Sequence, residues 1–145
     1  MKYSKSAYWE ILYPFAVSLT LGVGFLFIEN LISINFKGLV NASLNLFGIL
    51  IGFFITVLTI INTIENSYTR ALKEGDSFHL LSMYLKHAIW ACFISIILSI
   101  IHVMFYDALK LKYESIINTI FILGLILALI TSYRFIRIFL KLILK

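Results

Sequence analysis

A regular set of polar and small residues runs through the apolar segment NASLNLFGILIGFFITVLTIINT, residues 41–63. Its members recur every three or four residues: Asn41, Asn45, Gly48, Gly52, Thr56, Thr59 and Thr63. We call these seven residues the polar stripe; Asn66 continues the same spacing. Because an α-helix has about 3.6 residues per turn, this spacing places the set on one helical face. Its amides and hydroxyls can hydrogen-bond to a neighbouring helix or to water.

Such a face has a physical use inside a lipid bilayer. Acyl chains are as apolar as leucine, so helices in lipid associate through small residues and interhelical hydrogen bonds. Gly48 and Gly52 form a small-residue pair of this kind, with Thr56 one turn further on. Two interpretations stay open. The polar stripe packs against other helices, within one bundle or across a homo-oligomer, or it lines a water-filled path in an oligomer.

A later segment repeats the pattern at intervals of four and three residues: Ala88, Cys92, Ser95, Ser99, His102 and Tyr106. The same two interpretations, helix association or pore lining, apply to Ser95 and Ser99. Shorter sets occur in the first and last apolar segments: Ser18 and Gly22, then Gly124, Ala128 and Ser132. Every apolar segment therefore has one face that we expect to avoid lipid.

The sequence predicts a polar cluster at the outer side of the bundle. Glu29, His102 and Asn118 fall at a similar depth, together with Asn41 and Asn45. Ionisable groups inside a membrane usually face a bundle interior or a cavity. Either Glu29 and Asp107 simply reach the membrane interface, or the cluster forms a polar vestibule with a proton-sensitive Glu29–His102 pair.

Enzymatic chemistry has no support in the residue spacing. The chain lacks the H-E-x-x-H, P-loop and G-x-S-x-G motifs and any Cys/His cluster with metal-ligand spacing. Its three histidines, His79, His87 and His102, are spread along one segment. We therefore expect no enzyme, no cofactor and no metal site.

Composition indicates which elements must position these residues. The 145 residues are 61% hydrophobic and 13% charged, against about 25% charged in soluble domains. Residues 11–28, 38–64, 88–106 and 115–133 contain no Asp, Glu, Lys or Arg, and a membrane-spanning helix needs about 20 such residues. The sequence predicts an all-α membrane protein, one domain over 1–145, with four transmembrane helices at about 11–33, 39–64, 88–106 and 115–133.

The distribution of Lys and Arg predicts the orientation. Nine of the twelve lie at the N-terminus, in the middle segment or at the C-terminus, and such residues concentrate on the cytoplasmic side. We expect a bacterial inner membrane protein with both termini in the cytoplasm. The middle segment, residues 65–87, predicts a helical cytosolic hairpin broken at Gly75, because glycine favours helix ends.

The C-terminal segment predicts a basic extension of the fourth helix. Arg134, Arg137, Lys141 and Lys145 share one helical face. We interpret this face as an anchor on anionic lipid; the alternative is that, with residues 65–87, it docks a cytosolic protein partner. Because the orientation explains the net charge of +5, no nucleic-acid partner is expected.

The segment LNLFGILIGFFITVLTII, followed by RALKEGDSFHLLSMYLKHAIW, is similar to small four-helix membrane proteins encoded beside bacterial antiphage defence genes. The resemblance implies an effector or sensor that works with a cytosolic partner. Small multidrug transporters also have four helices, but their glutamate lies in the cytosolic half of helix one, unlike Glu29. We expect a homo-oligomeric channel-like or membrane-perturbing subunit. The alternatives are a non-conducting anchor or sensor and, third, a small transporter.

Overall fold

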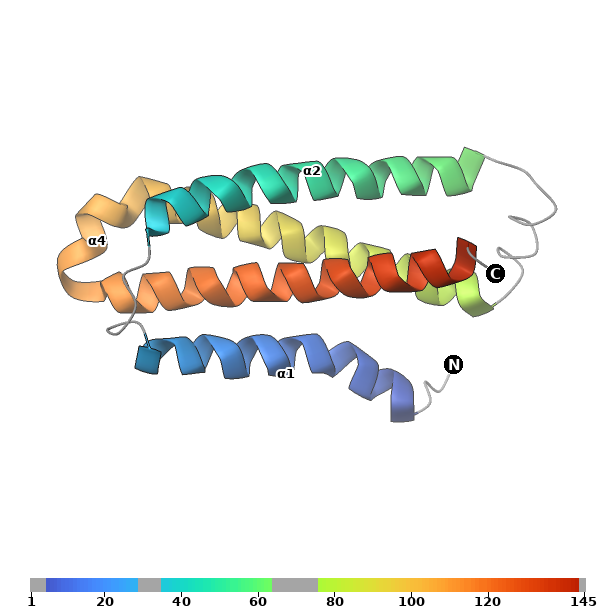
Figure 1. Ribbon diagram of the computed structural model, residues 1–145, viewed down its shortest axis with the longest axis horizontal. Helices are drawn as coiled ribbons and strands as arrows, with labels where there is room; N and C mark the ends of the chain where they lie inside the picture. Colours follow the sequence, from blue (N-terminus) through green and yellow to red (C-terminus); the bar gives the residue numbers. More distant parts are fainter. Residues whose placement is uncertain (1–4, 29–34, 64–75, 144–145) are drawn as a thin grey trace.

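The computed structural model describes residues 5–28, 35–63 and 76–143. Apart from Asn35, these residues are helical: α1 spans Lys5–Ile28, α2 spans Phe36–Thr63 and α4 spans Asp76–Ile143. Figure 1 shows α4 reversing direction, so that its two arms lie side by side. We call residues 76–105 the first arm and residues 114–143 the second arm. With α1 and α2, they make four helical rods.

The two arms of α4 run antiparallel. Cys92 Sγ lies 3.3 Å from Ser132 Oγ, and His102 Nε2 lies 2.9 Å from Asn118 Oδ1, so residue numbers rise along one arm as they fall along the other. We expected a break between residues 106 and 115. The backbone instead stays helical through this region, and the chain reverses direction within α4 (Figure 1).

Three helical stretches are long and apolar enough to cross a membrane: Phe36–Ile61, Leu81–Phe105 and Glu114–Lys141. All three extend beyond the charge-free stretches: Lys37 falls within the first, Lys86 within the second and Arg134 within the third. The apolar part of α1, Leu12–Phe27, is shorter, and residues 29–33 of the expected first span lie outside the described residues. The all-helical fold is confirmed, with three helical stretches of membrane-spanning length among the described residues.

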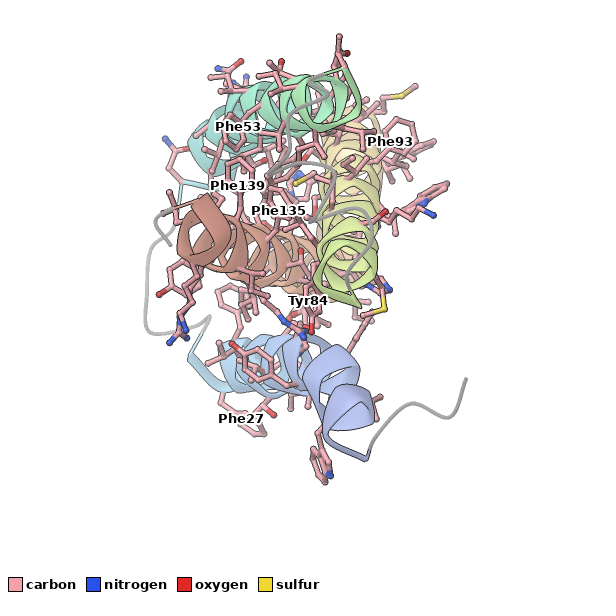
Figure 2. The ribbon with its side chains drawn as sticks, turned by 90° about the vertical axis from the view of Figure 1, so that its right-hand side faces the viewer. Phe27, Phe53, Tyr84, Phe93, Phe135 and Phe139 are labelled. Atoms are coloured by element: carbon pink, nitrogen blue, oxygen red, sulfur yellow. The ribbon has the colours of Figure 1, made fainter. Side chains whose placement is uncertain are left out.

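The main core lies between α2 and the two arms of α4. Phe47 and Phe54 of α2 are fully buried and share a cluster with Cys92 and Phe135. The ring of Phe54 meets that of Phe135 edge-on, with centroids 5.1 Å apart. Figure 2 shows Phe135 and Phe139 pointing into the space between the second arm and α2. Aromatic packing of this kind joins α2 to α4.

On the other side of α4, α1 packs through a face of small residues. Pro14, Ser18 and Gly22 are buried at intervals of four residues. A Cβ atom added to Gly22 would overlap the Leu123 side chain on the second arm. The absence of a side chain at Gly22 therefore lets α1 approach α4 closely, as small residues do in membrane helix pairs.

Parts of the expected cytosolic surface lie outside the described residues. These are residues 65–75 of the predicted hairpin, including Gly75, and Lys145 of the basic face. The helix that follows begins at Asp76, and α4 continues to Ile143 beyond Arg134, Arg137 and Lys141.

Candidate functional site

The polar stripe lies on the outer surface of α2. All seven of its residues are exposed, and Asn66 is outside the described residues. The buried residues of α2 recur on the other side of the helix: Val40, Ser43, Phe47, Phe54 and Val57. At about 100° per residue, the centres of the two sets lie on nearly opposite faces. In the part of the chain that the structure describes, the polar stripe therefore lies outside the bundle, where another copy or water can meet it.

Glycines show the contrast between packed and unpacked helix faces most clearly. A Cβ atom on Gly124 would lie 2.6 Å from Leu98 Cδ1, so Gly124 is held between the two arms of α4. Gly48 and Gly52 have no such neighbour within 4 Å in the described part of the chain. The small-residue pair of α2 is thus open to whatever surrounds the single chain.

The threonines of the polar stripe hydrogen-bond to their own helix. The hydroxyl of Thr56 donates to the Gly52 carbonyl at 2.9 Å, that of Thr59 to Ile55 at 2.9 Å, and that of Thr63 to Thr59 at 2.8 Å. Each hydroxyl oxygen keeps acceptor capacity. The outer face of α2 therefore carries oxygen atoms that can accept hydrogen bonds from water or from a neighbouring helix.

The second polar set, on the first arm, lies inside the bundle. Ser95 donates to the Gly124 carbonyl at 2.7 Å. Ser99 donates to the Ser95 carbonyl at 2.7 Å and lies 3.1 Å from the Ser43 hydroxyl of α2. Ser95 and Ser99 are both buried. In this chain they join α2 and both arms of α4, and the structure does not bring them to the polar stripe.

The expected outer polar cluster is divided. His102 and Asn118 are buried and 2.9 Å apart, and the His102 ring stacks on Phe36 with centroids 6.0 Å apart. Asn41 and Asn45 are exposed on α2 instead. Glu29 lies outside the described residues. The His102–Asn118 pair links the two arms of α4 near the point where the chain reverses direction. The sequence placed these polar residues at a similar depth in the membrane, but only the fold shows which of them meet.

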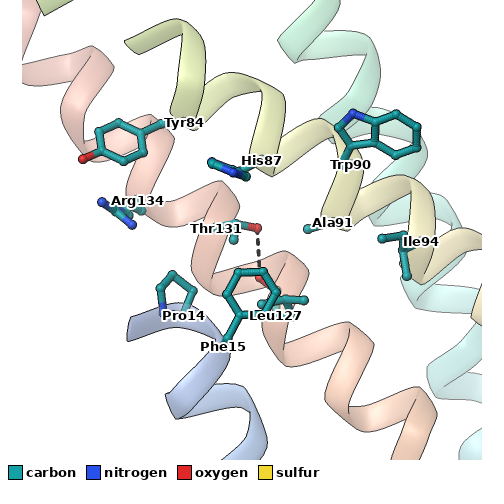
Figure 3. A pocket seen from close by; sticks show the side chains of 10 residues that line it. All are labelled: Pro14, Phe15, Tyr84, His87, Trp90, Ala91, Ile94, Leu127, Thr131 and Arg134. Atoms are coloured by element: carbon teal, nitrogen blue, oxygen red, sulfur yellow. Dashed lines mark hydrogen bonds between the residues drawn. The ribbon is translucent and has the colours of Figure 1, made fainter. Parts of the chain in front are cut away.

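A small cavity lies between α1 and both arms of α4 (Figure 3). Its volume is about 100 Å³, and its walls include Phe15, Tyr84 and Trp90. Thr131 on its wall donates to the Leu127 carbonyl at 2.8 Å. Pockets for small-molecule ligands usually measure about 300–1,000 Å³, so this cavity is smaller than a typical ligand pocket.

The basic face lies on the second arm. Arg137 and Lys141 are exposed, and the Arg134 guanidinium lies 4.0 Å from the centre of the Tyr84 ring. Among the residues that the structure describes, no group of three His, Cys, Asp or Glu side chains is placed to hold a metal ion.

Comparisons of the chain with protein-family models, with curated proteins and with solved structures gave no match. The similarity to defence-associated membrane subunits therefore rests on the two stretches quoted above.

Sequence reasoning missed residues on both sides of the bundle. Ser43 lies on the core face of α2, and its signal was the spacing it shares with Phe47 and Phe54. Trp9 and Tyr133 line a groove beside the basic face. In the sequence, each is a large amphipathic aromatic residue near a cationic residue and near the end of an apolar segment, and this pattern could have pointed to the groove.

Proposed function

We propose that the protein is a non-enzymatic subunit of a homo-oligomer in the bacterial inner membrane, in which polar stripes of neighbouring copies face one another and line a path for water or ions. The observation that carries this proposal is the exposure of the whole polar stripe, opposite the core face of α2. Lipid offers no partner to the amides of Asn41 and Asn45 or to the remaining acceptor sites of the threonine hydroxyls, whereas a second copy or a column of water supplies them.

The length of the polar stripe favours a path over a simple packing seam. Asn41 and Thr63 are 22 residues apart, which corresponds to about 33 Å of helix. The hydrocarbon core of a bilayer is about 30 Å thick. Two helices can associate through a few turns of small residues, but a path for ions needs polar atoms across the whole thickness.

One observation favours the second candidate, a non-conducting anchor or sensor. The hydroxyls of Thr56, Thr59 and Thr63 already donate to backbone carbonyls, so these threonines can also sit in a dry interface between copies. In that case residues 65–87 and the basic C-terminal face would recruit a cytosolic partner. The similarity to defence-associated subunits fits either candidate, as an effector or as a sensor. A small transporter is the third candidate.

Ion flux through liposomes that contain the purified protein tests the leading proposal. We expect the wild-type protein to crosslink as an oligomer and to release a trapped ion. Gly52→Leu places a large side chain on the open face of the stripe and should reduce both signals. Leu46→Ala, at an exposed α2 position outside the stripe, is the matched control and should change neither.

An oligomer that crosslinks fully yet passes no ions would contradict the conducting function and favour the anchor. A monomer that passes ions would contradict the role of the stripe.

A further inference from the structure

A groove with cationic and aromatic walls lies between α1 and the C-terminal end of α4. Its volume is about 500 Å³. Its walls include two aromatic residues of α1 and four residues of the second arm: Trp9, Tyr13, Tyr133, Arg134, Arg137 and Lys141. We call it the basic groove. None of the described side chains that line it is acidic.

The position of the basic groove along the second arm indicates its depth in a membrane. The apolar stretch of this arm begins at Glu114. A helix rises about 1.5 Å per residue, so a helix that enters the hydrocarbon at Glu114 has crossed about 30 Å, the thickness of the hydrocarbon core, when it reaches Arg134. Arg137 and Lys141 then lie beyond the hydrocarbon, within the layer of lipid headgroups.

The aromatic residues point to the same layer. Trp9 is 75% exposed and Tyr133 is 66% exposed, although both have large apolar rings. Tryptophan and tyrosine concentrate at the membrane interface because one end of each side chain is apolar and the other polar. A groove that combines such rings with Arg137 and Lys141 matches a ligand with an apolar part and an anionic part.

We propose that the basic groove binds one anionic phospholipid, with its phosphate oxygens on Arg137 and Lys141 and its glycerol region against Trp9 and Tyr133. Basic sites between membrane helices at headgroup depth bind anionic lipids in this way. The cation of Arg134 lies over the Tyr84 ring and helps to form the groove wall. A free phosphate ion shares the anionic chemistry but would not use the exposed aromatic rings. This inference does not depend on the proposed path through an oligomer.

Fluorescence of Trp9 tests the proposal directly. The chain has two tryptophans, so a Trp90→Phe variant leaves Trp9 as the reporter. The full-length variant is reconstituted with small fractions of brominated phosphatidylglycerol or brominated phosphatidylcholine, which quench nearby tryptophan. We expect the anionic lipid to quench Trp9 at a much lower fraction than the zwitterionic lipid does.

Charge variants identify the residues responsible. Each cation near an anionic membrane contributes about fivefold in affinity, so Arg137→Gln with Lys141→Gln should weaken the preference about 25-fold. Lys37→Gln with Lys86→Gln removes the same charge from exposed positions outside the groove and should leave the preference unchanged. Arg137→Lys keeps the positive charge and should retain the preference for the anionic lipid. A folded variant that keeps the preference shows that the loss in the glutamine variants comes from the missing charge and not from misfolding.

Three results would overturn the inference. Equal quenching by both lipids would show that the groove does not select an anionic lipid. Equal weakening by the two double variants would show attraction by overall charge alone. Loss of the preference on addition of inorganic phosphate would identify a site for a soluble anion instead.

Discussion

Hydroxyl side chains in these helices form two kinds of hydrogen bond. Ser43 and Ser95 reach another helix or the other arm of α4, to Ser99 and to the Gly124 carbonyl respectively. Thr56 and its neighbours in the polar stripe donate within α2. A hydrogen bond between helices fixes their relative position, whereas one within a helix leaves the outer surface free to meet water or a second copy.

Thr56 is the residue that best separates a path from a dry interface. Thr56→Val keeps the shape of the side chain and removes its hydroxyl. If the polar stripe lines a path, this variant should still assemble but conduct less, because an apolar constriction sheds water. Thr56→Phe should reduce conduction further by filling the path. Single-channel or liposome flux measurements on crosslinked oligomers provide the readout.

The control for this prediction is stability. In a dry interface, Thr56→Val should cost about 0.6 kcal/mol, the mean for hydrogen bonds inside membranes, and leave any flux unchanged. Unchanged flux in both assembled Thr56 variants would remove α2 from the path.

At the scale of the element, α2 has a buried face and an exposed face with different residues. Its core face places Phe47 and Phe54 against α4, while the opposite face carries the polar stripe. Because the two faces are nearly opposite, a change on one can be made without disturbing the packing of the other. This separation makes assembly and folding of the chain independently testable.

Glycine substitutions should divide according to the two kinds of helix face. Gly22→Ala and Gly124→Ala insert a Cβ against Leu123 or Leu98, and overpacking of this kind costs about 1–3 kcal/mol. A Cβ atom added at Gly48 or Gly52 has no neighbour within 4 Å among the described residues. Gly48→Ala and Gly52→Ala should therefore not lower the free energy of unfolding of the monomer. Controlled unfolding in detergent under monomeric conditions measures the difference.

Larger substitutions extend the glycine test to assembly. Gly48→Leu should weaken oligomers in crosslinking experiments while the monomer stays folded. Destabilisation of the monomer by Gly48→Ala as severe as that by Gly22→Ala would mean that the stripe packs within the chain after all.

At the scale of the whole molecule, α1 and α2 lie on opposite sides of the paired arms of α4 (Figure 1). In this arrangement α4 is the central layer, and α2 is peripheral with its outer face uncovered. α1 and α2 are both peripheral, and α2 is the one whose outer face carries the polar stripe. The basic groove lies on the α1 side, so the proposed lipid site and the proposed contact between copies would use different surfaces.

Orientation in the membrane is tested by cysteine accessibility. In a Cys92→Ser background, single cysteines at Lys37 and Lys110 should react with an impermeant thiol reagent in intact spheroplasts, and one at Glu74 should not. The background is conservative because a serine hydroxyl can replace the thiol beside Ser132. Labelling at Glu74, or protection at both other sites, would reverse the predicted orientation.

Composition and periodicity determined the helical class, the long apolar stretches and the fact that each polar set occupies one helical face. These properties are local: they depend on the hydropathy of consecutive residues and on the pitch of the helix. The length of the polar stripe on α2 was therefore readable from residues 41–63 without knowledge of the fold.

Tertiary structure decided where each face points. The sets that contain Thr56 and Ser95 look alike in sequence, yet Ser95 is buried between the arms and Thr56 is exposed. In lipid, apolar surface gains nothing by leaving the solvent, so hydrophobicity does not assign an inner face to a helix. Packing does: Phe47 and Phe54 fit the surface of α4 closely, and their burial turns the polar stripe outward.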